Sequence, residues 1–236
     1  MFRHPADDEP SSSSIVDELF ASQIITGRVC DVCHHLSINI EPSYVLTLPL
    51  LTSHVDAPVS LESCLSAFGG VEQLDSVHCA RCHPLINPSG SLCLVGGRDL
   101  VDCLFSPSSR GCQSQRRSML RYCPPYLIIH LLRFNSQHSK RTCPVSVPRR
   151  LLLGNDVVIG DADVTDYELC SLCCHVDSHV IGSGHYVTYA TLPAQVTWYR
   201  FDDVTVTRVD IDHELESDAL RQNVYLIFYR RRHVTH

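Results

Sequence analysis

The sequence has no apolar run long enough to cross a membrane and no segment resembling a secretory leader. A membrane helix needs roughly 18 to 20 consecutive apolar residues, and no stretch of this 236-residue chain approaches that length. The first 14 residues carry Asp7, Asp8 and Glu9 followed by four serines, a composition that secretory signals do not have. We therefore expect an intracellular protein, in the cytoplasm, the nucleus or both.

Basic residues are scarce as well. Lysine and arginine total 19 against 26 aspartates and glutamates, which gives a net charge of −7. This balance disfavours general nucleic-acid binding, which needs cations to neutralise phosphates, and it would suit a basic protein partner. Because 44% of the residues are hydrophobic, the chain can bury a substantial core. We expect one globular domain, alone or with an added lobe, and neither nucleic acid nor membrane as a partner.

Cysteine, in contrast, is abundant. The chain contains 13 cysteines, and inside a cell this number points to metal ligands or buried thiols before disulfides. A single Cys-x-x-Cys pair is weak evidence, so the context of each pair has to decide. Three pairs are present, Cys30/Cys33, Cys79/Cys82 and Cys170/Cys173.

Two of these pairs predict one zinc site. Cys30/Cys33 and Cys79/Cys82 each lie in a polar, turn-like stretch. Four thiolates bind Zn²⁺ at about 2.3 Å and can cross-link two hairpin tips in a lobe with a small core. A decayed, metal-free site is the alternative. A thioredoxin-like redox role is disfavoured, because neither pair opens a helix after a strand.

The other cysteines and histidines near these pairs are interpreted as packing or surface residues. Four histidines flank the two pairs and could replace a ligand, but four thiolates already complete the coordination; they are His34, His35, His78 and His83. The third cysteine group lies in an apolar run, so we expect its thiols to pack in a central strand rather than to bind metal. That group consists of Cys170, Cys173 and Cys174 with His175.

A histidine and a carboxylate near the C-terminus predict half of a catalytic triad. A nucleophilic cysteine needs an imidazole to take its proton and an acceptor to orient that imidazole. His185 follows Gly182 and Gly184, which allow a tight turn, and Asp202 ends an aromatic-rich segment. Both segments have strand patterns, so the two side chains could meet across a sheet. The alternative is that Asp202 and Asp203 form only a strand-end turn.

Five segments, in the same order, resemble the ubiquitin-specific protease family. They are residues 16–20 leading into 30–33, the strand at 124–134, the Gly-His-Tyr box at 184–186, the box at 198–203 and the strand at 223–229. The resemblance extends from about residue 15 to residue 229. It implies a papain-like cysteine protease of the α+β class, which removes ubiquitin by hydrolysing isopeptide bonds at the C-terminus of ubiquitin.

The resemblance also implies roles for particular residues. His185 would be the general base, Asp202 the third triad member, and Asp203 a supporting acid. A structural Zn²⁺ would be held by four thiolates, those of Cys30, Cys33, Cys79 and Cys82. Ubiquitin and ubiquitinated proteins would be the partners.

One part of the family pattern is absent. The family's nucleophile lies in a Gly-Asn-Thr-Cys-Tyr type box before the zinc ligands, whereas none of the 29 residues before Cys30 is a cysteine. An internal start at Met1, a fragment and a true loss remain open, and we expect the chain by itself to be inactive. Cys112, before a possible helix at 113–122, is a weak substitute, because a helix N-terminus would lower the pKa of its thiol.

The expected organisation follows from these segments. A disordered linker at 1–14 precedes a zinc-clasped fingers lobe at 15–122, which has an insertion loop near 83–122. A strand-rich palm at 123–232 and a tail at 233–236 follow, and the family's thumb lobe is missing. Strand patterns are found at 44–50 and 204–209, and an amphipathic stretch at 60–68. The face left without a thumb predicts poor solubility.

Three functional hypotheses follow. The first is the C-terminal part of a deubiquitinating cysteine protease. The second is an inactive ubiquitin-binding scaffold that has lost the nucleophile. A zinc-dependent adaptor unrelated to ubiquitin is the reserve hypothesis.

Overall fold

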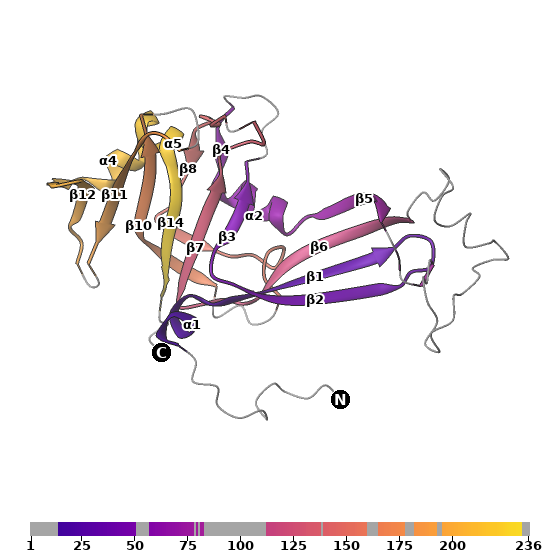
Figure 1. The fold of residues 1–236 in the computed structure, drawn as a ribbon. Coiled ribbons are helices and arrows are strands. Elements are labelled where there is room, and N and C mark those ends of the chain that lie inside the picture. Colours follow the sequence, from indigo (N-terminus) through magenta and orange to yellow (C-terminus); the bar gives the residue numbers. More distant parts are fainter. Residues whose placement is uncertain are drawn as a thin grey trace.

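A computed structural model describes the fold in nine stretches of the chain: residues 14–50, 57–77, 79, 81–82, 112–137, 139–159, 165–177, 182–192 and 195–232. All but the last residue of the expected linker at 1–14, most of the expected insertion loop and the tail at 233–236 lie outside these residues. Two large sheets dominate the described part (Figure 1). The sheets confirm the strand-rich α+β class.

The first sheet, which we call the fingers sheet, has four antiparallel strands. Their order is β2-β1-β6-β5, and in Figure 1 they project away from the rest of the molecule. The strands are β1 (Ser22–Cys30), β2 (Leu36–Ser43), β5 (Val71–Val77) and β6 (Cys112–Tyr122).

The prediction of a helix at 113–122 is wrong. This segment is β6, and it lies between β1 and β5. Both edges of the segment are hydrogen-bonded to neighbouring strands, and such tertiary pairing outweighs a weak local preference for helix.

The second sheet, the palm sheet, holds eight strands. Seven follow the order β13-β12-β11-β10-β14-β7-β3, and β9 pairs with β10. Among the described strands of this sheet, only β3 and β7 run parallel. The strands are β3 (Leu46–Pro49), β7 (Tyr126–Leu132), β9 (Arg150–Leu152), β10 (Asp166–Val176), β11 (His185–Thr191), β12 (Trp198–Asp202), β13 (Thr205–Val209) and β14 (Val224–Arg231). A separate parallel pair joins β4 (Val59–Ser60) to β8 (Val145–Ser146).

One face of the palm sheet carries the hydrophobic core. Alternate residues of its central strands are fully buried, such as Ile129 and Leu131 on β7 and Ile227 on β14, as the two-residue period of a strand requires. The helices α2 (Leu61–Phe68), α4 (Ile211–Glu216) and α5 (Asp218–Asn223) contribute further core residues. The amphipathic stretch expected at 60–68 is confirmed as α2, with Ser60 as its N-cap.

A buried arginine joins the end of β7 to these helices. Arg133 is fully buried, and its guanidinium donates to the carbonyl oxygens of Arg221 at 2.7 Å and Cys143 at 3.1 Å. A third bond reaches the carbonyl oxygen of Val224 at 2.5 Å, just after α5. Burial lowers the pKa of Arg133 to about 10, so the group stays charged and binds the negative end of the helix dipole.

The chain passes between the two sheets more than once. β1 and β2 lie in the fingers sheet, β3 in the palm sheet, β5 and β6 again in the fingers sheet, and β7 in the palm sheet. The sequence predicted one boundary near residue 122. The short helix α1 (Ile15–Phe20), with a capping box at Ser14, lies against β7, where Phe20 contacts Tyr126. Within the described residues, no helix is long and apolar enough to cross a membrane.

Candidate active site and metal site

A glycine turn positions His185 at the start of β11. Gly182 and Gly184 have φ angles of +83° and +106°, in the left-handed region that side chains rarely adopt. A Cβ atom at Gly184 would also lie 2.7 Å from both Nε2 of His175 and the carbonyl oxygen of Val176. The backbone before His185 can therefore take this path only with glycine at position 184.

His175, on β10, holds the same turn through a hydrogen bond. Its buried ring contacts the carbonyl oxygen of Ser183 through Nε2 at 2.8 Å, which requires the proton on Nε2. The buried Lys140 donates to the carbonyl oxygen of His175 and to Oδ1 of Asn223. The sequence pattern placed His175 only in a packed strand. Its contact with the turn depends on the pairing of β10 with β11, which one sequence does not specify.

The structure brings His185 and Asp202 together. Nε2 of His185 lies 2.6 Å from Oδ1 of Asp202, and both side chains are about one-third exposed. The contact crosses the β11/β12 pair, in which Thr188 is opposite Phe201. Because the carboxylate accepts from Nε2, Nδ1 is the ring nitrogen that remains for a reacting group.

Neighbouring charges favour the ionised form of this pair. The hydrogen bond from His185 and the guanidinium of Arg200, 2.8 Å away, lower the pKa of Asp202. The hydrogen bond to Asp202 raises the pKa of His185, burial opposes that rise, and the charge of Asp203 adds to it. The site can therefore hold an imidazolium, as a general base requires after it has taken a proton. Arg200 was not expected from the sequence, since nothing in a strand pattern marks a second partner for the carboxylate.

Asp203 occupies the turn between β12 and β13. It is exposed and has a φ angle of +50°. One oxygen of its carboxylate lies within 4.8 Å of the ligand atoms of His185 and Asp202. The expected strand-end turn and the expected cluster with the histidine are thus both present.

The described cysteines near His185 are poor nucleophiles. Cys173 and Cys174 on β10 pair with Thr188 and Val187 of β11. Burial raises the pKa of Cys173, and it raises that of Cys174 to about 12. Both thiols therefore stay protonated near neutral pH.

Cys112 is also a poor candidate for the nucleophile. It begins a strand rather than a helix, it is buried, and it packs against Cys30 and Cys79. Burial raises the pKa of its thiol. In Figure 1 the start of β6 lies at the far tip of the fingers sheet, at the opposite end of the molecule from β11.

Four cysteine sulfurs converge at that tip. The Sγ atoms of Cys30, Cys33, Cys79 and Cys82 all lie within 4.8 Å of one another. Cys30 and Cys82 are 3.7 Å apart, and Cys33 and Cys79 are 3.6 Å apart, too far for disulfides. A tetrahedron of sulfurs around Zn²⁺, with bonds of about 2.3 Å, has edges of about 3.8 Å. The donor set therefore fits Zn²⁺.

Backbone groups lower the pKa of two of these thiols, whereas the hydrogen bond with Cys33 and burial raise the pKa of Cys82. Hydrogen bonds from the backbone of Cys33 and then Val32 lower the pKa of Cys30 to about 6, against the effect of burial. The backbone of Cys82 and Arg81 lowers the pKa of Cys79 in the same way. Metal ligands must be deprotonated, so this arrangement favours a cation.

The described histidines beside these cysteines do not belong to the cluster. His34 and His35 are exposed, and within the described part of the chain neither belongs to a metal-sized group. His78 and His83 lie outside the described residues. Cys170, Cys173 and Cys174 lie on β10 in the middle of the palm sheet, which confirms their interpretation as packing residues.

Comparison with known proteins supports the sequence resemblance. A family profile described as ubiquitin carboxyl-terminal hydrolase matches residues 3–229. Ubiquitin carboxyl-terminal hydrolase Usp2 of Drosophila melanogaster is 26% identical over 223 residues, which cover 93% of this chain and 20% of that protein. Ubiquitin carboxyl-terminal hydrolase 19 of Arabidopsis thaliana is 26% identical over 224 residues, covering 93% and 28%. The chain thus spans less than a third of these relatives.

Solved structures share the fold. A complex of Ubp8, Sgf11, Sus1 and Sgf73, a SAGA DUB module bound to ubiquitin aldehyde, matches with a TM-score of 0.67 and 21% identity over 94% of this chain and 44% of that chain. A variant of the yeast SAGA DUB module matches with a TM-score of 0.68 and 23% identity, covering 94% and 43%. At these identities the likeness shows the fold alone.

Proposed function

The chain belongs to the ubiquitin carboxyl-terminal hydrolase family, and from this we propose that it is the C-terminal part of a deubiquitinating cysteine protease. The observation that carries the proposal is the 2.6 Å contact between His185 and Asp202 within a chain of this family. The contact leaves Nδ1 of the imidazole free to act on a thiol.

The proposed reaction begins when His185 takes the proton of a cysteine thiol at Nδ1. This cysteine would be supplied by a segment of the full-length protein outside the present chain. The thiolate attacks the carbonyl carbon of the last ubiquitin residue, and Asp202 stabilises the imidazolium. When the carbon–nitrogen bond breaks, the imidazolium protonates the leaving lysine amine, and a thioester remains. Water, deprotonated by His185, then hydrolyses the thioester and releases ubiquitin with a free carboxylate.

The remaining residues have supporting roles in this proposal. Asp203 adds negative charge near the imidazolium, and Arg200 fixes the second oxygen of Asp202. Zn²⁺, held by the four thiolates of the cluster, would be structural, because its four ligands leave no open position for water or substrate. It would join the turn after β1 to the end of β5.

Ubiquitin and ubiquitinated proteins are the proposed partners. The first matched structure contains ubiquitin aldehyde, and its fold is shared over 94% of this chain. Ubiquitin conjugates occur inside cells, so the proposed location is the cytoplasm, the nucleus or both. We propose neither nucleic acid nor a membrane as a partner.

Steady-state hydrolysis of ubiquitin bearing a fluorogenic C-terminal amide tests the proposal on the full-length protein. His185→Gln should lower kcat at least 1,000-fold, since the thiol loses its base, with ubiquitin affinity changed less than threefold. His213→Gln, on the exposed side of α4, is the matched control and should retain full activity.

The present chain alone should bind ubiquitin without turning it over. Activity of the full-length protein that survives His185→Gln would refute the assignment of the base. Ubiquitin binding without activity in the full-length protein would instead favour the inactive scaffold.

A further inference from the structure

The two edges of the fingers sheet are protected to different degrees. β5 carries Glu72 and Asp75, and its register with β6 is irregular; charges and irregularities of this kind keep an edge from pairing with another chain. β2 carries no charged residue from Leu36 to Ile40 and pairs with β1 in unbroken register. Among the described residues, no strand pairs with its other side.

The free side of β2 presents its backbone groups at regular intervals. The backbone N–H of Cys30 donates to the carbonyl oxygen of His35 at 3.1 Å, which makes this a hydrogen-bonded pair of the β1/β2 ladder. Hydrogen-bonded and non-hydrogen-bonded pairs alternate in an antiparallel ladder. Leu36, Ile38 and Ile40 occupy the non-hydrogen-bonded positions, so their N–H and C=O groups point away from β1.

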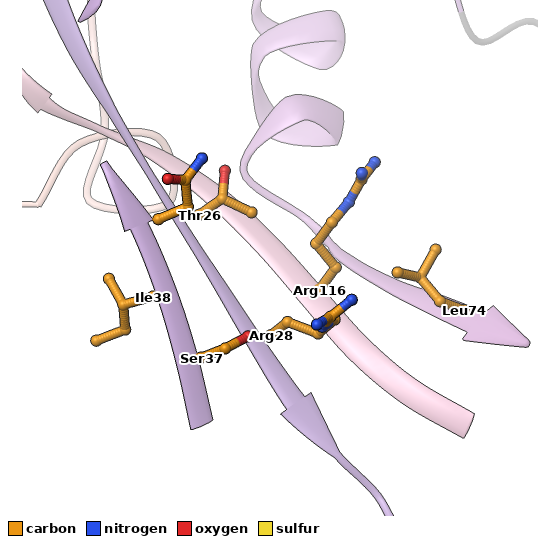
Figure 2. A pocket seen from close by; sticks show the side chains of 7 residues that line it. Thr26, Arg28, Ser37, Ile38, Leu74 and Arg116 are labelled. Atoms are coloured by element: carbon orange, nitrogen blue, oxygen red, sulfur yellow. The ribbon is translucent and has the colours of Figure 1, made fainter. Parts of the chain in front are cut away.

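The same three residues carry exposed apolar side chains. Leu36, Ile38 and Ile40 are 52%, 59% and 45% exposed. They lie on one face of the sheet because strand residues alternate in direction. In Figure 2 Ile38 lies at the outer edge of the pocket that Arg28 and Arg116 also line, and its side chain points away from both arginines. Free backbone groups and an apolar stripe thus coincide at a single edge, which is the combination that favours strand addition.

We propose that this edge pairs antiparallel with the same edge of a second copy of the chain, with Ile38 opposite the second copy's Ile38. This register places Leu36 opposite Ile40, so the apolar stripes join on one face of a continuous sheet. On the other face Ser37 lies opposite Asn39, and the two can exchange a hydrogen bond. The edge is self-complementary on both faces, as a two-fold interface requires.

The ends of β2 limit the pairing to this segment. Pro42 has no N–H to donate, which closes the ladder after Ile40. In the proposed register the carboxylate of Glu41 lies opposite the ring of His35, a hydrogen-bond donor, and no like charges meet. The paired segment is short, so the dimer should be weak and dependent on concentration. This pairing does not depend on the catalytic proposal.

Sedimentation velocity of the full chain over a wide concentration range tests the proposal. The wild-type chain, of 26.4 kDa, should reach twice its monomer mass at high concentration. Ile38→Lys and Ile38→Glu should each remain monomeric, since like charges would face each other across the two-fold axis. An equimolar mixture of the two variants should restore the dimer, because Lys and Glu then face each other.

Val71→Lys is the matched control. Val71 is 65% exposed on the opposite edge strand of the same sheet, and this variant should dimerise like wild type. A wild-type chain that stays monomeric at all concentrations would overturn the proposal. So would a dimer that survives Ile38→Lys, a mixture that fails to restore dimerisation, or open-ended association, since each would place the contact elsewhere.

Discussion

The palm and the fingers sheet hold their functional side chains by different physical means. In the palm, His185 and Asp202 lie on strands that share a core of many buried aliphatic and aromatic side chains. At the tip of the fingers sheet, the buried cluster formed by the described residues consists of cysteines: Cys30, Cys79 and Cys112, with Cys33 and Cys82 packed against them. The hydrophobic effect can therefore position the palm pair, whereas the four sulfurs at the fingertip would need a bound metal ion to hold them together.

Because the two regions are held by different forces, a perturbation of one region should stay local to it. Removing a cation from the fingertip leaves four thiolates and little apolar contact to hold two chain segments together. Changing His175, which contacts the turn before His185, leaves the palm core in place and moves only His185. Variants in one region should therefore leave the other region unchanged.

Loss of the metal should give the largest effect. Cys79→Ser should reduce bound zinc from one equivalent to none, because a site with three thiolates loses most of its affinity. Hydrogen-exchange protection near Cys30 should fall at least 100-fold, with protection in β10 and β14 unchanged within threefold. Cys170→Ser, in the third cysteine pair, is the control and should keep its zinc. An equal loss of protection in both sheets would show that the palm also depends on the metal.

The glycine turn should be the most sensitive point of the palm. Gly184→Ala combines a positive φ angle with a Cβ atom 2.7 Å from the ring of His175, and it should cost roughly 2 kcal/mol of unfolding free energy. Chemical denaturation measures this cost. Gly182→Ala is the control, since it has a positive φ angle but no atom within 4 Å of the added Cβ. A smaller cost at position 184 than at 182 would contradict the close contact.

His175 should act on the base through the turn. His175→Phe keeps a ring but removes the donor to the carbonyl oxygen of Ser183, so amide exchange at 184–186 should accelerate about tenfold. His175→Gln, whose amide can donate, should restore most of the protection. If the two variants behave alike, the ring acts only by packing.

The smallest effect concerns the pH dependence of the pair. The raised pKa of His185 contributes stability that is present below its ordinary value of 6.5 and is lost as pH rises through the folded value. The lowered pKa of Asp202 contributes stability above 3.8 that is lost as pH falls through the folded value. NMR titration of the His185 ring should give a pKa above 6.5, which Asp202→Asn lowers. An unchanged pKa in that variant would show that the contact is absent in solution.

Features with strong local signals could be predicted from the sequence. The cysteine spacing predicted the four-sulfur cluster, and the alternating segments around residues 185 and 202 predicted two strands, which proved to be neighbours. The amphipathic pattern at 60–68 predicted α2. In each case a few neighbouring residues carry the signal.

Features that depend on long-range pairing could not be predicted. The segment 113–122 is rich in polar residues that accept helix or strand, and only its position between β1 and β5 selects the strand. β3 joins the palm sheet through a parallel pairing with β7, although β2, the strand before it in sequence, belongs to the fingers sheet. The contacts of His175 and Arg200 likewise arise from strand register, which a single sequence does not specify.

We propose that this chain supplies the base, and not the nucleophile, of a deubiquitinase. The decisive measurement is labelling with ubiquitin that has an electrophilic C-terminus, which bonds covalently to an activated cysteine. In the full-length protein, the probe should label one cysteine outside the present chain. His185→Gln should slow this labelling at least 100-fold relative to wild type. The present chain alone should bind the probe without forming an adduct. A specific adduct on Cys112, or on any other cysteine of this chain, would contradict the account.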